Sequence, residues 1–257
     1  MEKGKCNIMV KTEIRNNTGI LILNRPEKRN ALNPELCASI INKLKEFAVD
    51  DNIKSVILIG EGTSFCAGAD LSWLNSIKDY SSIKNEEDTE VVAGLFLALY
   101  DFPKPLIAAV NGPAVGGGCG LASVCDFVFA DKNEAKFGYT EVKIGFIPAI
   151  VSIFLIKKIG EGKAKQILLA GEIIDSEKAL KIGLADYLSG NVLSDALSFA
   201  EKMNLNSSYS ISLTKDLIRN ISNMKVHDAV NYCVRLNAIS RSSEDFKIGI
   251  NKFLNKN

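Results

Sequence analysis

A run of glycines between a predicted strand and a predicted helix is the stretch of this chain with the clearest chemical use. Leu106 to Val110 is a short apolar run typical of a buried strand, and Asn111-Gly112-Pro113 ends it with turn residues. A helix is predicted to begin in Gly116-Gly117-Gly118, where free backbone N–H groups can face a developing negative charge. This pattern predicts an oxyanion site. A tight strand-to-helix crossing that needs small residues explains the same glycines and stays open.

Two phosphate-binding loops do not fit this stretch. The dinucleotide fingerprint Gly-x-Gly-x-x-Gly, begun at Gly116, would need its third glycine where this chain has Leu121. The mononucleotide loop ends in Gly-Lys-Ser or Gly-Lys-Thr, which does not follow these glycines. The sequence therefore argues against a nucleotide-phosphate site here.

Glu141 is a candidate acid or base, because it lies among apolar residues between Tyr139 and Pro148. Apolar surroundings disfavour the charged form of a carboxyl group and raise its pKa, which suits proton exchange near neutral pH. The same segment is also compatible with a surface glutamate in a loop.

The cysteines and the single histidine do not support other chemistries. The six cysteines are scattered without a Cys-x-x-Cys pair, and His227 is the only histidine, so zinc and redox sites are disfavoured and no metal is predicted. A nucleophilic Cys119 would need His227 or a carboxylate as its base, and no such spacing is recognisable. We expect most of the cysteines to be small buried hydrophobes, and His227 to lie on the surface or cap a helix.

The surrounding elements alternate between strand and helix. Further strands are predicted at residues 20–23, 56–59 and 127–130. Asn33 can cap a helix that begins at Pro34 and keeps an apolar face to about Phe47. Residues 79–88 are charged and predict a mobile loop before a helix at 87–100. Helices are also predicted at 151–159, 163–170 and 176–182. This alternation favours an α/β fold with a covered sheet.

From about Ser194 onward, three further amphipathic helices are predicted, with little strand signal. They form a helical appendage of the kind that packs against another subunit. The composition is that of a globular chain, with 31 basic and 30 acidic residues among 257, so no strong attraction to nucleic acid or anionic membranes is expected. No signal peptide or membrane span is recognisable, which predicts a cytoplasmic location.

Five segments together resemble the crotonases, the enoyl-CoA hydratase/isomerase superfamily. They run nearly end to end: 23–32, 65–71, 109–112, 137–138 and Glu141. The resemblance implies an α/β crotonase (ClpP/crotonase-type) spiral of β-β-α units over residues 1–193. It also implies a C-terminal helical trimerisation region over 194–257, with trimers that often pair into hexamers.

The resemblance also implies roles for individual residues. The backbone N–H groups of Ala69 and Gly117 match the oxyanion hole that holds the thioester carbonyl of an acyl-CoA, and Glu141 matches a catalytic carboxylate. Coenzyme A arrives as part of the substrate, so no separate cofactor is implied. The positions that match substrate-binding residues are Arg29, Ala67, Asp70, Leu71, Phe253 and Lys256.

Two departures from the common hydratase pattern narrow the expected substrate. Gly120 stands at the catalytic position where common hydratases have their first glutamate, and residues 149–152 lack the glycines that usually follow Pro148. Both features are similar to the branch that contains 3-methylglutaconyl-CoA hydratases. The hypothesis is therefore a hydratase for a branched or carboxylated enoyl-CoA, with Lys143 as a candidate partner for the terminal carboxylate or a plain surface lysine.

Two other functions stay open. An enoyl-CoA isomerase would use the same oxyanion hole, with Glu141 as its sole proton shuttle. A non-catalytic acyl-CoA-binding or RNA-binding protein is the alternative of another class, because some crotonases bind RNA through a lysine-rich helix. The corresponding helix here offers only Lys43 and Lys45, which argues against RNA.

Overall fold

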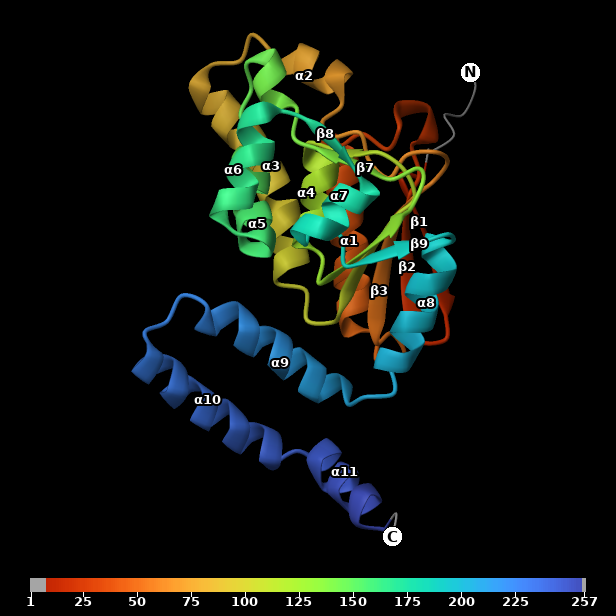
Figure 1. Cartoon of the computed structure of the whole chain (residues 1–257), viewed down its shortest axis with the longest axis vertical. Coiled ribbons are helices and arrows are strands. Elements are labelled where there is room, and N and C mark those ends of the chain that lie inside the picture. The colour runs from red at the N-terminus through yellow and green to blue at the C-terminus, as the bar shows by residue number, and fades with distance from the viewer. Residues whose placement is uncertain (1–7, 256–257) are drawn as a thin grey trace, which may run out of the picture.

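A six-stranded sheet forms the centre of the computed structural model, which describes residues 8–255 (Figure 1). Its strands, in spatial order, are β1 (Val10–Arg15), β2 (Thr18–Leu23), β3 (Ser55–Gly60), β4 (Leu106–Val110), β6 (Phe127–Asp131) and β9 (Tyr187–Ser189). β1 and β2 pair in antiparallel fashion, and every other neighbouring pair is parallel. The three internal strands predicted at 20–23, 56–59 and 127–130 are confirmed, together with the central strand β4.

Helices cover both faces of this sheet, as a mainly parallel sheet requires. On one face, α1 (Pro34–Val49) packs beside α3 (Ser82–Tyr100). On the other face, α8 (Val192–Met203) packs its alanines against Ile57 and Ile107. The predicted start of α1 is confirmed, because the Asn33 side chain accepts a hydrogen bond from Leu36 N at 2.9 Å.

A smaller sheet and several short helices complete the core. β5 (Ala114–Val115), β7 (Lys136–Gly138) and β8 (Ile173–Asp175) form this second sheet. The helices around it are α2 (Leu71–Ile77), α4 (Gly117–Val124), α5 (Ala149–Ile159), α6 (Glu161–Ala170) and α7 (Ser176–Ile182), with 3-10 turns η1 (Pro26–Lys28) and η2 (Glu141–Ile144). The predicted helices that become α5, α6 and α7 are confirmed.

The loop predicted for residues 79–88 is wrong, because α3 already begins at Ser82. The Ser81 side chain caps this helix by accepting a hydrogen bond from Lys84 N at 3.4 Å. Glutamate and lysine are good helix formers, so a charged stretch after a capping serine continues a helix instead of interrupting it. This correction matters for function, since the first turns of α3 border the cavity described below.

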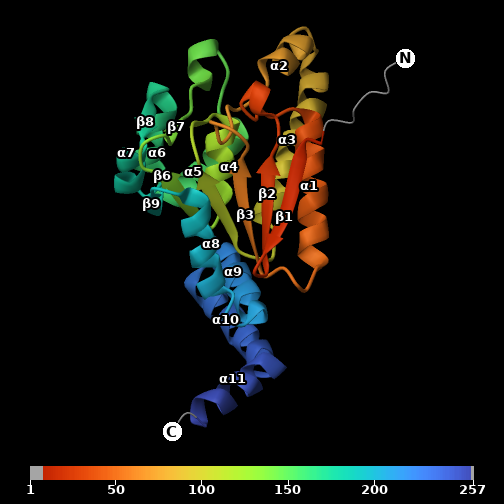
Figure 2. The same ribbon diagram turned by 90° about the vertical axis from the view of Figure 1, so that its right-hand side faces the viewer.

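Three C-terminal helices extend from one end of the core as an arm (Figures 1 and 2). They are α9 (Ser208–Ile221), α10 (Val226–Arg241) and α11 (Glu244–Leu254). With α8 this makes four described helices where three were predicted, and the expected division at 193/194 falls inside α8, which packs on the sheet. No side chain of α9 or α10 is buried by the described residues.

No helix among residues 8–255 combines the length and apolar character that crossing a bilayer requires.

Candidate active site

The glycine turn before α4 lies against the segment 65–71, which the family resemblance includes. Cys66 forms an isolated parallel bridge with Ala114, which brings the segment after it beside the start of α4. Gly68 has a φ of +91°, and a Cβ placed on it would lie 2.8 Å from the Val115 carbonyl oxygen and 3.5 Å from Gly117 N. Position 68 therefore requires glycine both for its backbone conformation and for this close approach.

Two backbone N–H groups at this junction have no acceptor among residues 8–255. Leu32 N donates to the Gly68 carbonyl at 2.7 Å and Asp70 N donates to the Leu32 carbonyl at 2.8 Å, so the N–H of the intervening Ala69 is directed away from this pairing. Gly117 is the first residue of α4 and has no intrahelical acceptor. Within residues 8–255 neither N–H donates a backbone hydrogen bond, and both residues border one cavity.

Glu141 borders the same cavity from the first residue of η2, which begins three positions after the last residue of β7. Gly116 has a φ of +54°, and a Cβ on it would lie 3.0 Å from Glu141 Oε1. The absence of a side chain at position 116 therefore leaves room for the Glu141 carboxyl group. Glu141 Oε2 is buried and has no hydrogen-bond partner among the described residues. Burial raises the pKa of this carboxyl group above its usual value of 4.5. The prediction of a carboxyl in apolar surroundings is confirmed over that of a surface glutamate.

The cavity itself has a volume of about 490 Å³ and a mainly apolar lining. α2 and α3 form one wall, and the segment from Ile144 to Val151 forms another. Trp73 Nε1 donates to Asp88 Oδ1 at 3.2 Å and thereby joins α2 to α3. One carboxyl group, two free N–H donors and an apolar chamber are the groups needed to stabilise an enolate and move a proton beside it.

Comparison with known proteins identifies the family. The sequence profile described as Enoyl-CoA hydratase/isomerase matches residues 13–257. The chain belongs to this family. A Thermus thermophilus protein assigned to the enoyl-CoA hydratases is 39% identical over 96% of this chain and 98% of its own length. The 2,3-dehydroadipyl-CoA hydratase of Escherichia coli is 35% identical over 92% of each chain.

A solved structure shows the same fold. The crystal structure of a Legionella pneumophila protein assigned as an enoyl-CoA hydratase/isomerase (crotonase) superposes with a TM-score of 0.89, at 33% identity over 96% of both chains. The fold is therefore the α/β crotonase spiral with its C-terminal helical region. The protein is an enzyme of the enoyl-CoA hydratase class, a hydro-lyase.

The predicted substrate-binding residues differ in their position relative to this crotonase site. Ala67 and Leu71 border the cavity. Arg29 is exposed, and its carbonyl oxygen accepts a hydrogen bond from Ala67 N at 3.0 Å, which places it beside that segment. The Asp70 carboxylate is buried, caps α2 and pairs with Arg25 at 2.7 Å, so the protein's own groups occupy it. The Phe253 side chain and Lys256 lie outside the described residues.

Two predicted residues of the crotonase site supply no group to the cavity. Gly120 is buried in α4 and is absent from the described lining. Lys143 is exposed and lies against Gly171, where an added Cβ would approach its Cε to 3.2 Å, and it does not border the cavity within residues 8–255. Lys78, at the end of α2, is a lysine that does border it.

Cys119 and His227 are placed as the sequence predicted. Cys119 is fully buried, and burial raises the pKa of its thiol to about 12, which removes it as a nucleophile near neutral pH. Cys37, Cys66 and Cys125 are likewise buried. His227 is exposed on the first turn of α10.

Sequence reasoning missed the wall of the crotonase cavity that α3 provides. Asn85, Asp88, Thr89 and Val92 border the cavity, and their spacing is that of one helix face. Asp88, Thr89 and Val92 belong to the helix predicted at 87–100, whereas Asn85 lies only in the predicted loop, and no signal in the sequence indicates that this helix face borders a cavity. Val151 was also missed, because its apolar side chain indicates a helix core and carries no chemical signal.

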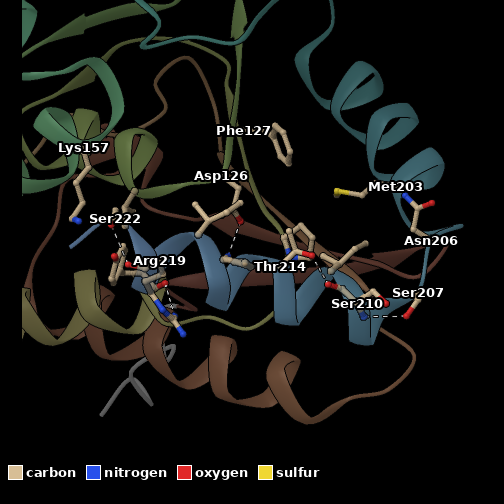
Figure 3. Close-up of a pocket in the computed structure, with 16 residues that line it drawn as sticks. Asp126, Phe127, Lys157, Met203, Asn206, Ser207, Ser210, Thr214, Arg219 and Ser222 are labelled. Carbon is tan, nitrogen blue, oxygen red and sulfur yellow. Dashed lines mark hydrogen bonds and ion pairs between the residues drawn. The ribbon is translucent and has the colours of Figure 1, made fainter. Parts of the chain in front are cut away.

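A second and larger cavity, of about 730 Å³, lies between α9 and the core (Figure 3). Lys215 Nζ of α9 lies 2.6 Å from Asp126 Oδ2 of the core, and the Arg219 guanidinium lies 5.7 Å from the Tyr100 ring. None of the described residues that line it also lines the Glu141 cavity. It is therefore a space at the junction of arm and core, separate from the candidate active site.

Proposed function

We propose that this enzyme adds water reversibly to a branched or carboxylated 2-enoyl-CoA, such as 3-methylglutaconyl-CoA, with Glu141 as the only carboxyl group in the chemistry. One observation carries the proposal: the unpartnered Glu141 carboxyl shares its cavity with the free N–H groups of Ala69 and Gly117. No metal or additional cofactor enters the proposed reaction, because coenzyme A is part of the substrate.

One carboxyl group suffices for both proton transfers of a syn addition. The thioester oxygen accepts hydrogen bonds from Ala69 N and Gly117 N. The Glu141 carboxylate takes a proton from water as the water oxygen bonds to C3, and the electrons of the C2–C3 double bond move into an enolate whose charge rests on the thioester oxygen. Glu141 then returns that proton to C2, so the product has gained one water and the carboxylate is ionised again. Elimination follows the same steps in reverse.

Two observations support a carboxylated substrate. The Escherichia coli relative acts on 2,3-dehydroadipyl-CoA, a thioester of a dicarboxylic acid. In the cavity of the present chain, Lys78 offers N–H donors at the wall formed by α2 and α3, whereas the Asn85 amide donates to the Tyr80 carbonyl at 3.3 Å. Lys78 forms no ion pair with any described residue, so its charge is available to a substrate carboxylate. Lys78 thus replaces Lys143 in the proposal.

Turnover of matched thioesters tests the proposed function. Purified protein is incubated with 3-methylglutaconyl-CoA, crotonyl-CoA and a 3-enoyl-CoA, while absorbance of the conjugated thioester is followed and products are weighed by mass spectrometry. We expect absorbance to fall with gain of one water, fastest for 3-methylglutaconyl-CoA. A rise in absorbance from the 3-enoyl substrate without change in mass, and no hydration, would show an isomerase instead.

The pH dependence of hydration is expected to report the raised pKa of Glu141. The carboxylate must be ionised to accept a proton from water, so kcat/KM falls as the pH falls through that pKa. Because burial raises the pKa, the acid limb should lie above pH 4.5, the usual value for glutamate. The kcat/KM of crotonyl-CoA, whose acyl group does not titrate, measured against pH in overlapping buffers checks this. An acid limb centred below 4.5 would contradict a buried general base.

We further propose that the arm assembles the protein into homotrimers, or pairs of trimers. Its apolar side chains are exposed in the single chain, including Val226, Val234 and Leu254, which are 77%, 63% and 65% exposed. Large apolar side chains exposed in this number on one part of a chain are typical of a protein interface. Sedimentation equilibrium is expected to give three or six times the mass of one chain, and a monomer at micromolar concentration would refute the assembly.

A further inference from the structure

Two apolar side chains occupy the space that a side chain at position 120 would need. A Cβ built on Gly120 would lie 2.4 Å from Val151 Cγ1, 2.8 Å from Val151 Cβ and 3.0 Å from Phe96 Cζ. The first two contacts are shorter than packed carbon atoms tolerate, and Val151 Cβ is not the far end of a flexible chain. Gly120 and Val151 are therefore complementary in size.

This packing joins three helices at the floor of the active-site cavity. Gly120 belongs to α4, Phe96 to α3 and Val151 to α5. Phe96 stacks on Phe154 with ring centroids 5.6 Å apart, which holds α3 and α5 together behind the contact. Val151 is only 6% exposed, yet it also borders the cavity beside Glu141.

The position of the contact relates it to the reacting carbons. Gly120 follows Gly117 by three residues on α4, so both lie on the same side of the helix, one turn apart. Gly117 offers the N–H for the thioester oxygen, and C2 and C3 lie within one helical turn of that oxygen in any enoyl thioester. Val151 fills the space beside Gly120 and also borders the cavity, so it presents an apolar surface on this side of α4.

We propose that Val151 is a specificity-determining residue whose side chain gives C3 an apolar wall that accepts a methyl branch. This inference rests on the proposed function and names the feature of the substrate that the wall selects. A methyl group on C3 gains van der Waals contact and leaves water when it meets Val151. A polar side chain at position 151 would lose its hydration on contact with that methyl group.

The ratio of kcat/KM for 3-methylcrotonyl-CoA to that for crotonyl-CoA tests the wall, because these substrates differ by one methyl group. Val151→Thr keeps the shape and adds a hydroxyl, and Val151→Ala removes the contact. We expect each variant to lower the ratio roughly tenfold, as is usual for one methyl group in an apolar pocket. Val92→Ala, the same change at another lining residue of the cavity, is the control and should leave the ratio within about twofold.

The outcomes separate this inference from the proposed function. An unchanged ratio in both Val151 variants, or an equal fall in Val92→Ala, overturns the role of Val151 while hydration of crotonyl-CoA still stands. Turnover of neither thioester by the native protein overturns the proposed function and the inference with it. Glutaconyl-CoA and 3-methylglutaconyl-CoA provide a second pair with the same single difference, and the ratio must fall in that pair too.

A thermal double-mutant cycle tests the packing without any assay of turnover. Gly120→Ala is expected to lower Tm, and adding Val151→Ala should recover part of that loss, because it removes the Cγ1 atom at 2.4 Å while the Cβ atom at 2.8 Å remains. Gly118→Ala is the matched control on the same helix. Its Cβ would lie 2.0 Å from the Cys66 carbonyl oxygen, so Val151→Ala cannot relieve it. Additive losses in the Gly120 cycle would overturn the size complementarity.

Discussion

Glu141→Gln is expected to lower kcat for hydration about 10³-fold, while Tm at neutral pH stays unchanged or rises. Glutamine fills nearly the same space but can neither take a proton from water nor return one to C2. The stability follows from the sign of the pKa shift. Burial raises the pKa of Glu141 in the folded state, so its favourable contribution is present at low pH and is lost as the pH rises through that pKa. At neutral pH, glutamine therefore removes the free-energy cost of burying an ionised carboxylate.

Stopped-flow or steady-state hydration of crotonyl-CoA, together with calorimetry at neutral pH, measures both effects in one preparation. Glu134→Gln is the control, because Glu134 is exposed in the loop before β7 and changes the net charge by the same amount. We expect it to keep native activity and Tm. Retention of more than a tenth of native kcat by Glu141→Gln would show that another group transfers the proton.

Gly117→Pro is expected to lower kcat about 10²- to 10³-fold, because proline has no N–H to give to the thioester oxygen. The first residue of a helix is the position that tolerates proline best, since its N–H has no intrahelical acceptor. Gly117 is the first residue of α4, so the helix is expected to persist while one oxyanion donor is lost. Steady-state kinetics with crotonyl-CoA and circular dichroism measure the two together.

Two variants separate the loss of the N–H from other effects of proline at position 117. Gly117→Ala keeps the N–H and adds a Cβ that meets the mobile end of Leu32 at 2.9 Å, so it reports crowding alone. Ser82→Pro places proline at the first residue of α3, where the side chain is exposed and does not line the described cavity, and should leave kcat intact. If Gly117→Ala loses as much activity as Gly117→Pro, the N–H is not the decisive group.

The parts of the fold that could be predicted are those with a strong local signal. The Asn33-Pro34 cap and the apolar run of β4 have one interpretation each, and the structure confirms both. β1 could not be found, because only its first residue is buried and its side chains otherwise face solvent at the sheet edge. β5, β8 and β9 are two or three residues long, too short for any periodic pattern to show.

The residues of the active site could likewise be predicted only where a local signal marks them. The glycines and Glu141 could be singled out, because their residue types restrict what they can do. That Gly68 meets Gly117, or that Val151 meets Gly120, depends on contacts between segments far apart in the chain. The binding roles expected of Arg29, Asp70 and Phe253 rest on the family resemblance and stay predictions, and the Asp70 side chain also pairs with Arg25.

The separation of the arm from the core also sets an order on how this protein is made. Sheet and covering helices use residues up to Met203, so the core can close while the ribosome is still adding α9 to α11. The arm then has little to fold onto in its own chain beyond the contacts that Lys215 and Arg219 make with the core. On the proposed assembly, the arm helices would reach their final packing only when completed chains associate. The rate of this last folding step would therefore depend on the concentration of completed chains.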